Sequence, residues 1–262
     1  MTTKNAEVVF DVGAHKGEDS DFYLKLGYSV VAIEANPYLA ENLRKRFSSE
    51  ISEGRYTLID KAVGESGETI TFYVNEDVSV WGTANREWAE RNRRRGTHSK
   101  AIQVDSIRFS DVVKQHGCPH YLKVDIEGAD MLCIEGLRDV ECRPKYISLE
   151  SSITSWKEVL REFDLFEELG YTRFALVNQR KPHKSGQFTN RSGVPVSHTF
   201  ADDASGPFGE YLQCEWLTKR EAISRYKRIF LLYKTMGNDT LLAGVGRRLG
   251  LDYWFDTHAM RQ

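Results

Sequence analysis

The sequence predicts an α/β fold in which helices cover both faces of a mostly parallel sheet. Strand-like and helix-like segments alternate from residue 7 to residue 178, and several of the strand-like segments end in an acidic residue. Ligands bind such sheets at the carboxyl ends of the strands, so acidic side chains at that edge are candidates for a binding site.

Residues 8–37 carry the clearest pattern and are expected to form a strand, a turn, a helix and a second strand. The apolar runs at residues 8–10 and 30–33 are rich in β-branched side chains, as buried parallel strands require. Glycines mark the turn between the first strand and the helix, and an acid ends the second strand. The residues that this pattern places at a ligand are Asp11, Gly13, His15, Gly17 and Glu34.

The charge around this turn distinguishes between two classes of nucleotide ligand. A dinucleotide site has a G-x-G-x-x-G turn and places a diphosphate at a helix N-terminus. Only two of those glycines are present here, and Glu18, Asp19 and Asp21 would repel a diphosphate. S-Adenosyl-L-methionine has no phosphate, and its sulfonium, amino group and ribose diol suit acidic neighbours. The sequence therefore predicts this donor, with a nicotinamide-dependent oxidoreductase as the alternative.

The next part of the chain continues the alternation. A helix is expected to begin at Pro37, which suits a first helical turn. Residues 56–59 are expected to form a third strand, with Asp60 at its end, and Ala62 lies in the turn that follows. Residues 69–74 alternate in polarity, which predicts a strand or one arm of a hairpin.

Residues 78–100 are less regular and contain a basic run at residues 91–95 together with Trp81 and Trp88. Arginine and aromatic side chains together can bind phosphates and bases, which would suit an anionic substrate or RNA. The other interpretation is a solvated loop or helix face. The near-neutral charge of the chain favours the solvated face.

The fourth strand is the second informative segment. Residues 120–124 are expected to form this strand, and Asp125 and Glu127 follow it. Period-two alternation would place both carboxylates on the same side of the strand, at the ligand-binding end.

The remaining expected elements are a helix at residues 109–116, a short helix at 131–137, a fifth strand at 146–149 followed by Glu150, a helix that a capping box opens at Ser155, and a sixth strand at 171–178.

The pattern changes after residue 178. We expect a single domain over residues 1–262, with a core at 6–178 and a C-terminal extension at 179–262. Residues 179–209 are rich in Gly, Pro, Ser and basic side chains and are predicted to be a lid loop. Residues 218–236 are expected to be helical. An aromatic segment at 251–258 is a candidate for a last strand. A complete fold should also have an antiparallel seventh strand, and the sequence does not locate it.

Composition sets limits on function. The chain has 262 residues and a formal net charge of -2, which argues against a general nucleic-acid binder because such proteins are usually strongly basic. No apolar run approaches the length of a membrane span. The four cysteines contain no C-x-x-C pair, so we expect free thiols in a reducing cytoplasm rather than a zinc site or disulfides.

Two stretches resemble the FkbM family of S-adenosylmethionine-dependent methyltransferases. They are DVGAHKG with AIEANP in residues 9–37, and LKVDIEGAD at residues 122–130. The resemblance covers about residues 7–178, and the second stretch is the more specific. It implies a Rossmann-like class I methyltransferase fold and, most often, O-methylation of a hydroxyl on a sugar or natural product, with Asp60, Ala62 and Asp125 among the donor contacts.

Methyl transfer to an alcohol needs alignment of the reactants and a base for the hydroxyl proton. Asp125 is the first candidate for this base, although it could equally hold the amino group of the donor. Glu127 is the second candidate, and His198 could reach the site from the predicted lid. His258 could enter the site with the aromatic C-terminal segment. Strand-end acids such as Asp60 and Glu150 could also hold a metal, but ligand contacts explain them, so no metal is expected.

Overall fold

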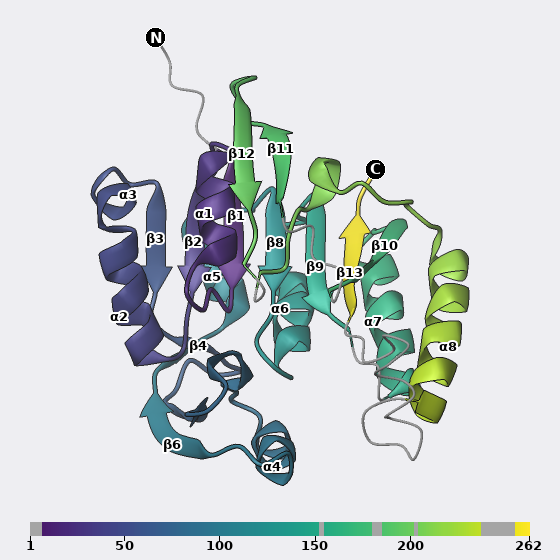
Figure 1. The fold of residues 1–262 in the computed structure, drawn as a ribbon, viewed down its shortest axis with the longest axis horizontal. Coiled ribbons are helices and arrows are strands. Elements are labelled where there is room, and N and C mark those ends of the chain that lie inside the picture. Colours follow the sequence, from purple (N-terminus) through teal and green to yellow (C-terminus); the bar gives the residue numbers. More distant parts are fainter. Residues whose placement is uncertain (1–6, 152–154, 180–184, 202–203, 237–254) are drawn as a thin grey trace. The chain divides into compact units, whose positions relative to one another are not determined.

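The structure is a computed structural model that describes residues 7–151, 155–179, 185–201, 204–236 and 255–262 (Figure 1). It divides into two compact units. The first comprises Met1–Pro144 and His183–Gly206, and the second comprises Lys145–Pro182 and Pro207–Gln262. The single domain that the sequence predicts stays a prediction.

The first unit contains four parallel strands in the order β8-β1-β2-β3. Their bounds are Val8–Val12 for β1, Ser29–Ile33 for β2, Tyr56–Ile59 for β3 and Tyr121–Val124 for β8. All four residues of β8 are buried, as are the last four residues of both β1 and β2. These strands confirm the parallel α/β pattern that the sequence predicts.

Helices cover both faces of these strands. In the register of β1 and β8, Phe10 pairs with Leu122, so Tyr121 points to the opposite face from Phe10. The Phe10 ring contacts Phe109 of α5, and the Tyr121 ring contacts Tyr23 of α1. The helices of this part are α1 (Glu18–Lys25), α2 (Pro37–Arg46), α3 (Ser48–Ser52), α5 (Phe109–His116) and α6 (Asp130–Gly136), with the 3-10 helix η2 (Leu137–Asp139).

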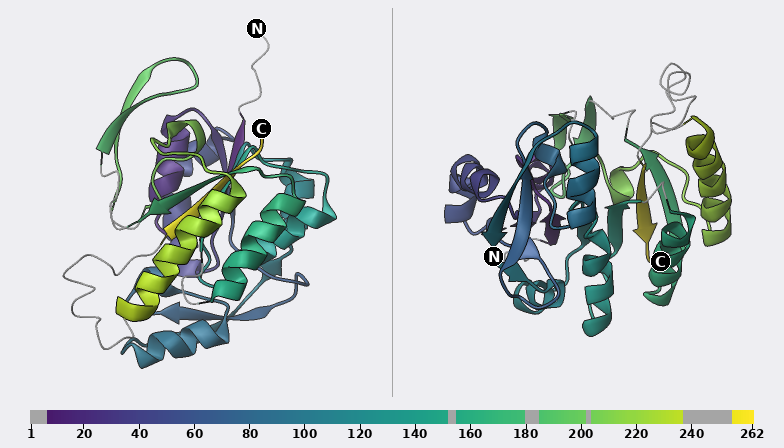
Figure 2. Two further views of the ribbon diagram at one scale, coloured as in Figure 1. Left: turned by 90° about the vertical axis from the view of Figure 1, so that its right-hand side faces the viewer. Right: turned by 90° about the horizontal axis from the view of Figure 1, so that it is seen from below.

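An insertion follows β3 and lies beyond the carboxyl ends of the parallel strands (Figures 1 and 2). Its strands β5 (Ile70–Asn75) and β6 (Ser99–Val104) pair antiparallel along their whole length. Between them lie η1 (Ser79–Trp81) and α4 (Arg86–Arg94). The short strands β4 (Ala62–Val63) and β7 (Ser106–Ile107) pair at its base. The helix α4 contains most of the basic run.

The predicted lid segment contains a β-hairpin, formed by β11 (Ser185–Thr189) and β12 (Pro195–Thr199). Its side chains pack on α1, because the rings of Phe188 and Phe200 each lie 4.8 Å from that of Phe22. The backbone amide of Arg191, in the hairpin turn, donates to Leu26 at the far end of α1. The hairpin turn therefore lies away from the carboxyl ends of the strands. Residues 180–184 and 202–203 lie outside the described residues, and the lid role stays a prediction.

The second unit contains three strands in the order β10-β13-β9. β13 (Phe255–Met260) runs antiparallel to both β9 (Tyr146–Glu150) and β10 (Arg173–Asn178). This is the antiparallel last strand for which the sequence offers residues 251–258 as a candidate. The candidate overlaps β13 at residues 255–258, and residues 251–254 lie outside the described part of the chain.

Two helices pack side by side in this unit (Figure 2). They are α7 (Trp156–Glu168) and α8 (Lys219–Met236), and η3 (Gly209–Tyr211) lies in the segment before α8. The predicted cap of α7 is present, since the Ser155 side chain accepts a hydrogen bond from the Glu158 amide. Lys219 pairs with Asp164 and Glu167, both at 2.7 Å. Within the described residues, no helix combines the length and the apolar character that crossing a membrane requires.

Cys118 and Cys142 form a disulfide, so the expectation of four free thiols is wrong for these two residues. They are 24 residues apart, and the fold brings the segment entering β8 next to the segment that follows η2. Such a pairing depends on tertiary structure and leaves no local signal in the sequence. Cys133 is buried and Cys214 is exposed, and both are free.

The disulfide should stabilise the fold. Cys142→Ser should lower the free energy of unfolding by about 2–4 kcal/mol, because the open chain gains loop entropy in the unfolded state. Denaturant titration of the oxidised wild type, the reduced wild type and the variant measures this difference. Cys214→Ser is the matched control and should change little. Equal stability of oxidised and reduced wild type would contradict this expectation.

Candidate functional site

The glycine turn wraps around the end of β2 through its backbone amides. The amides of Gly13 and Ala14 both donate to the carbonyl oxygen of Ile33, at 2.9 and 3.1 Å. The amide of His15 donates to Oε2 of Glu34 at 2.8 Å. These three amides of the turn therefore have partners within the protein.

Gly13 is required at its position in the turn. Its φ of +81° lies in the left-handed region, and a Cβ there would lie 1.9 Å from the carbonyl oxygen of Asp125. Both constraints favour glycine. The turn consequently lies directly against the end of β8, which joins the two motifs that the sequence singles out.

Glu34 is buried at the end of β2, as predicted. Its second carboxylate oxygen, Oε1, accepts a hydrogen bond from the Asn36 amide at 2.8 Å. Burial raises the pKa of Glu34 to about 7, and the hydrogen bonds from the amides of Asn36 and His15 only partly oppose this. Each oxygen of an ionised carboxylate has a further acceptor position, so Glu34 can still accept hydroxyl groups.

A buried lysine lies beneath the turn. The Nζ atom of Lys123, in β8, lies 3.2 Å from Oδ1 of Asp11 and 3.6 Å from Oδ2 of Asp19, and donates to the carbonyl oxygen of Gly13 at 3.1 Å. Ser20 also donates to Asp11, at 2.6 Å. We call Asp11, Gly13, Asp19 and Lys123 the lysine cluster. The sequence reading missed Lys123, although a lysine inside an apolar strand segment was the available signal.

Asp125 and Glu127 lie close together, but for a different reason from the one predicted. The strand β8 ends at Val124, so both acids belong to the following loop, and Glu127 has a left-handed φ of +51°. Oδ2 of Asp125 lies 4.0 Å from Nζ of Lys123. Oε2 of Glu127 lies 3.6 Å from Nη2 of Arg91. The two carboxylates thus face different cations.

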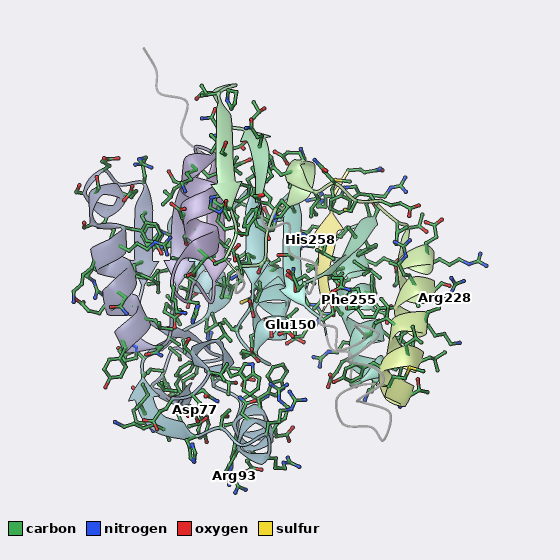
Figure 3. The ribbon with its side chains drawn as sticks, in the orientation of Figure 1. Asp77, Arg93, Glu150, Arg228, Phe255 and His258 are labelled. Atoms are coloured by element: carbon green, nitrogen blue, oxygen red, sulfur yellow. A yellow bond between two sulfur atoms is a disulfide. The ribbon has the colours of Figure 1, made fainter. Side chains whose placement is uncertain are left out.

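The insertion contacts both motifs. Nε2 of His15 lies 2.9 Å from Oγ of Ser79, and the Thr83 hydroxyl donates to the carbonyl oxygen of Glu127 at 2.7 Å. Within the basic run, Arg91 contacts Glu127, whereas Arg93 is exposed and points outward from α4 (Figure 3). The solvated-face interpretation therefore fits Arg93 but not Arg91.

The remaining predicted site residues of the first unit lie outside the lysine cluster. Asp60 is 56% exposed and pairs with Arg44 at 3.0 Å, at the end of β3. Ala62 is buried in β4, and Gly17 is the left-handed N-cap of α1. His198 packs between Phe22 and Phe200, with Nδ1 3.8 Å from Oδ2 of Asp21. Its described contacts are thus with α1 and the hairpin, and burial lowers its pKa.

In the second unit, His258 and Glu150 lie on neighbouring strands (Figure 3). Burial lowers the pKa of His258 to about 3, and so weak a base is poorly suited to remove a proton near neutral pH. Among the described residues, no group of three or more His, Cys, Asp and Glu side chains is arranged to hold a metal ion.

The chemistry of these side chains fits the predicted donor. The three turn amides that could approach a diphosphate have protein acceptors instead, and the first turn of α1 is acidic. Carboxylates of Glu34 and Asp125 remain at the carboxyl ends of β2 and β8, where hydroxyl and cationic groups would find acceptors. This set suits a sulfonium nucleoside better than a dinucleotide.

Comparison with solved structures finds distant likenesses. A precorrin-6y C5,15-methyltransferase from Geobacter metallireducens has 11% identity and a TM-score of 0.41, over 100% of this chain and 83% of that chain. A SAM-dependent methyltransferase from Geobacter sulfurreducens, in complex with S-adenosyl-L-homocysteine, has 12% identity and a TM-score of 0.38, over 99% and 86% of the two chains. Curated proteins give no significant match.

A family model gives the decisive comparison. The model described as the methyltransferase FkbM domain matches residues 11–173, which is more than half of the chain. The match contains the glycine turn, Glu34, the lysine cluster and the acids after β8. The chain belongs to the FkbM family of S-adenosylmethionine-dependent methyltransferases.

Proposed function

We propose that this enzyme methylates a hydroxyl oxygen of a small molecule, a sugar or a natural product. When bound, S-adenosylmethionine supplies a methyl group that its positively charged sulfur makes reactive. The protein has to hold this donor and the acceptor in line, keep water out and take up the hydroxyl proton. The adjacent carboxylates of Asp125 and Glu127 support a reaction in which a proton is removed.

The hydrogen bonds of the glycine turn are the observation that supports this proposal most strongly. Gly13, Ala14 and His15 direct their amides at Ile33 and Glu34, so these amides hold the turn around an acid instead of facing a phosphate. In a dinucleotide site the corresponding amides approach the diphosphate. This arrangement supports a phosphate-free donor and counts against the nicotinamide-dependent alternative.

We assign the donor contacts from the geometry of the turn. Glu34 would accept the ribose hydroxyls, because its carboxylate lies at the end of β2 and two amides fix its orientation. Asp125 would contact the amino group beside the glycine turn. Asp60 and Ala62 would lie near the adenine, where they follow β3.

A cytoplasmic location is part of the proposal, and the disulfide makes it testable. Thiols are kept reduced in the cytoplasm, whereas disulfides persist in oxidising compartments. Alkylation of protein taken directly from cells would show the state of Cys118 and Cys142. Reduced thiols would support the cytoplasmic location, and an oxidised pair would count against it.

The donor assignment predicts selective stabilisation. S-Adenosylhomocysteine at about one hundred times its Kd should raise the free energy of unfolding by about 2.7 kcal/mol, whereas NAD at the same concentration should have little effect. Thermal-shift measurement separates the two ligands. Tritiated S-adenosylmethionine and a panel of hydroxyl, amine and RNA acceptors then test the acceptor class. Transfer to RNA or amines but not to hydroxyls would contradict the proposal.

Glu34 should carry a large share of donor affinity. Glu34→Ala should weaken binding of S-adenosylmethionine by about 1.5–3 kcal/mol, the range for hydrogen bonds to a charged group. Isothermal calorimetry measures this loss. Glu41→Ala, an exposed acid on α2, is the control and should bind normally. Unchanged affinity in Glu34→Ala would mean that this residue does not hold the ribose.

The pH dependence gives an independent check on Glu34. Its pKa is raised to about 7, so the carboxylate gains its charge as the pH rises through that value. The ionised form accepts more hydroxyl hydrogen bonds, and affinity for S-adenosylhomocysteine should therefore increase between about pH 6 and pH 8. Glu34→Gln should lose this increase. An identical increase in the variant would assign the pH dependence to another group.

A further inference from the structure

The loop after β8 is clamped beneath the insertion. The Thr83 hydroxyl donates to the carbonyl oxygen of Glu127 at 2.7 Å, and the Asn85 side chain donates to that of Gly128 at 3.4 Å. The Trp88 indole lies against Gly128, where an added Cβ would come within 2.7 Å of Nε1. The insertion therefore fixes the position of the acids at the end of β8.

Glu127 has an unusual backbone conformation within this clamp. Its φ of +51° is in the left-handed region, which residues other than glycine rarely adopt. Conformations of this kind persist only where the surroundings enforce them, and they concentrate at functional sites. Here the conformation accompanies a side chain that is only 14% exposed, two residues after Asp125, whose carbonyl oxygen lies against Gly13.

Burial and neighbouring charges bring the pKa of Glu127 into the range that suits proton transfer. Burial raises its pKa to about 8; Asp125 and Asp130 also raise it, and Arg91 opposes them. Asp130 accepts hydrogen bonds from the amides of Ile126 and Gly128. A carboxyl group that titrates near neutral pH can both accept a proton and release it during turnover.

Arg91 is itself held in place. Its Cζ atom lies 3.8 Å from the centre of the Trp88 ring, a cation–π contact. Its Nε and Nη2 atoms donate to Oδ1 of Asn92 at 3.3 and 3.2 Å. The guanidinium thus has a fixed plane, and Nη2 also lies 3.6 Å from Oε2 of Glu127.

Asp125 has different surroundings. Its backbone carbonyl lies against Gly13, and its carboxylate faces Lys123 and is 39% exposed. It therefore belongs to the donor side of the site. Two neighbouring carboxylates in different environments commonly have different roles in acid–base chemistry.

We propose that Glu127 takes the proton from the acceptor hydroxyl, and that Arg91, stacked on Trp88, positions the Glu127 carboxylate for this step. Asp125 then contacts the donor and does not move the proton. The oxygen–methyl bond forms, the methyl–sulfur bond breaks with its electrons left on sulfur, and the hydroxyl proton moves to Glu127. This assignment rests on the proposed O-methyltransferase function.

The first test measures the titration of Glu127 without an acceptor. In protein labelled with ¹³C at glutamate carboxyls, one resonance should titrate near pH 8 and be absent in Glu127→Gln. Arg91→Met should move its midpoint to higher pH, because a cation that opposes the shift is lost. Arg93→Met, which removes an exposed arginine of the same helix, should leave it unchanged. A midpoint near the ordinary glutamate value, or one that Arg91→Met does not move, would overturn the proposal.

The second test separates donor binding from proton transfer. Glu127→Gln should bind S-adenosylhomocysteine within about twofold of wild type, whereas Asp125→Asn should bind at least about tenfold more weakly, as the loss of a charge-assisted contact predicts. Equal losses in the two variants would overturn the division of roles. Failure of wild type to bind S-adenosylhomocysteine would instead count against the donor and the proposed function.

The third test uses any hydroxyl acceptor that wild type methylates. Glu127→Gln should lower turnover by about 10²–10⁴-fold, the usual share of general-base catalysis. Wild-type turnover should rise with pH through about 8, where Glu127 loses its proton, and the rise should shift to higher pH in Arg91→Met. Full turnover in Glu127→Gln would overturn the proposal while leaving the methyltransferase function intact.

Discussion

The buried charge of Lys123 is the constraint on which the candidate site depends. An ammonium group in an apolar interior must be paired, and here Asp11, Asp19 and the carbonyl oxygen of Gly13 surround it. Burial lowers the pKa of Lys123, but the carboxylates of Asp11 and Asp19 more than offset this and hold it well above its usual value. Because each partner comes from a different element, the ion pairs fix β1, the glycine turn, α1 and β8 together. Loss of one partner would leave a buried charge uncompensated.

Asp19 connects this cluster to a distant part of the sequence. Its carboxylate accepts hydrogen bonds from the amides of Ser205 and Gly206, at 3.0 and 3.3 Å. Burial raises the pKa of Asp19 to about 6, and Lys123 opposes that shift. The segment that follows the β-hairpin is therefore bound to the first turn of α1, beside the glycine turn.

Sequence patterns predicted the parts of the site that depend on local structure. Gly13, Gly17 and Glu34 lie in one strand–turn–helix–strand unit, whose spacing determines where each side chain lies. The interactions that were missed join residues far apart in sequence. Lys123 reads simply as part of a strand until Asp11 and Asp19 are placed beside it, and the pairing of Cys118 with Cys142 needs the folded chain. The contact of Arg91 with Glu127 similarly depends on an insertion whose packing no periodicity reveals.

In our proposal, the glycine turn and Glu34 form a site for a phosphate-free, positively charged nucleoside donor. A crystal structure with S-adenosylhomocysteine tests this most directly. We expect the ribose hydroxyls on Glu34, the amino group near Asp125, and the amides of Gly13 and Ala14 still bonded to Ile33. A ribose that lies away from Glu34, or turn amides released from Ile33 to face the ligand, would contradict it.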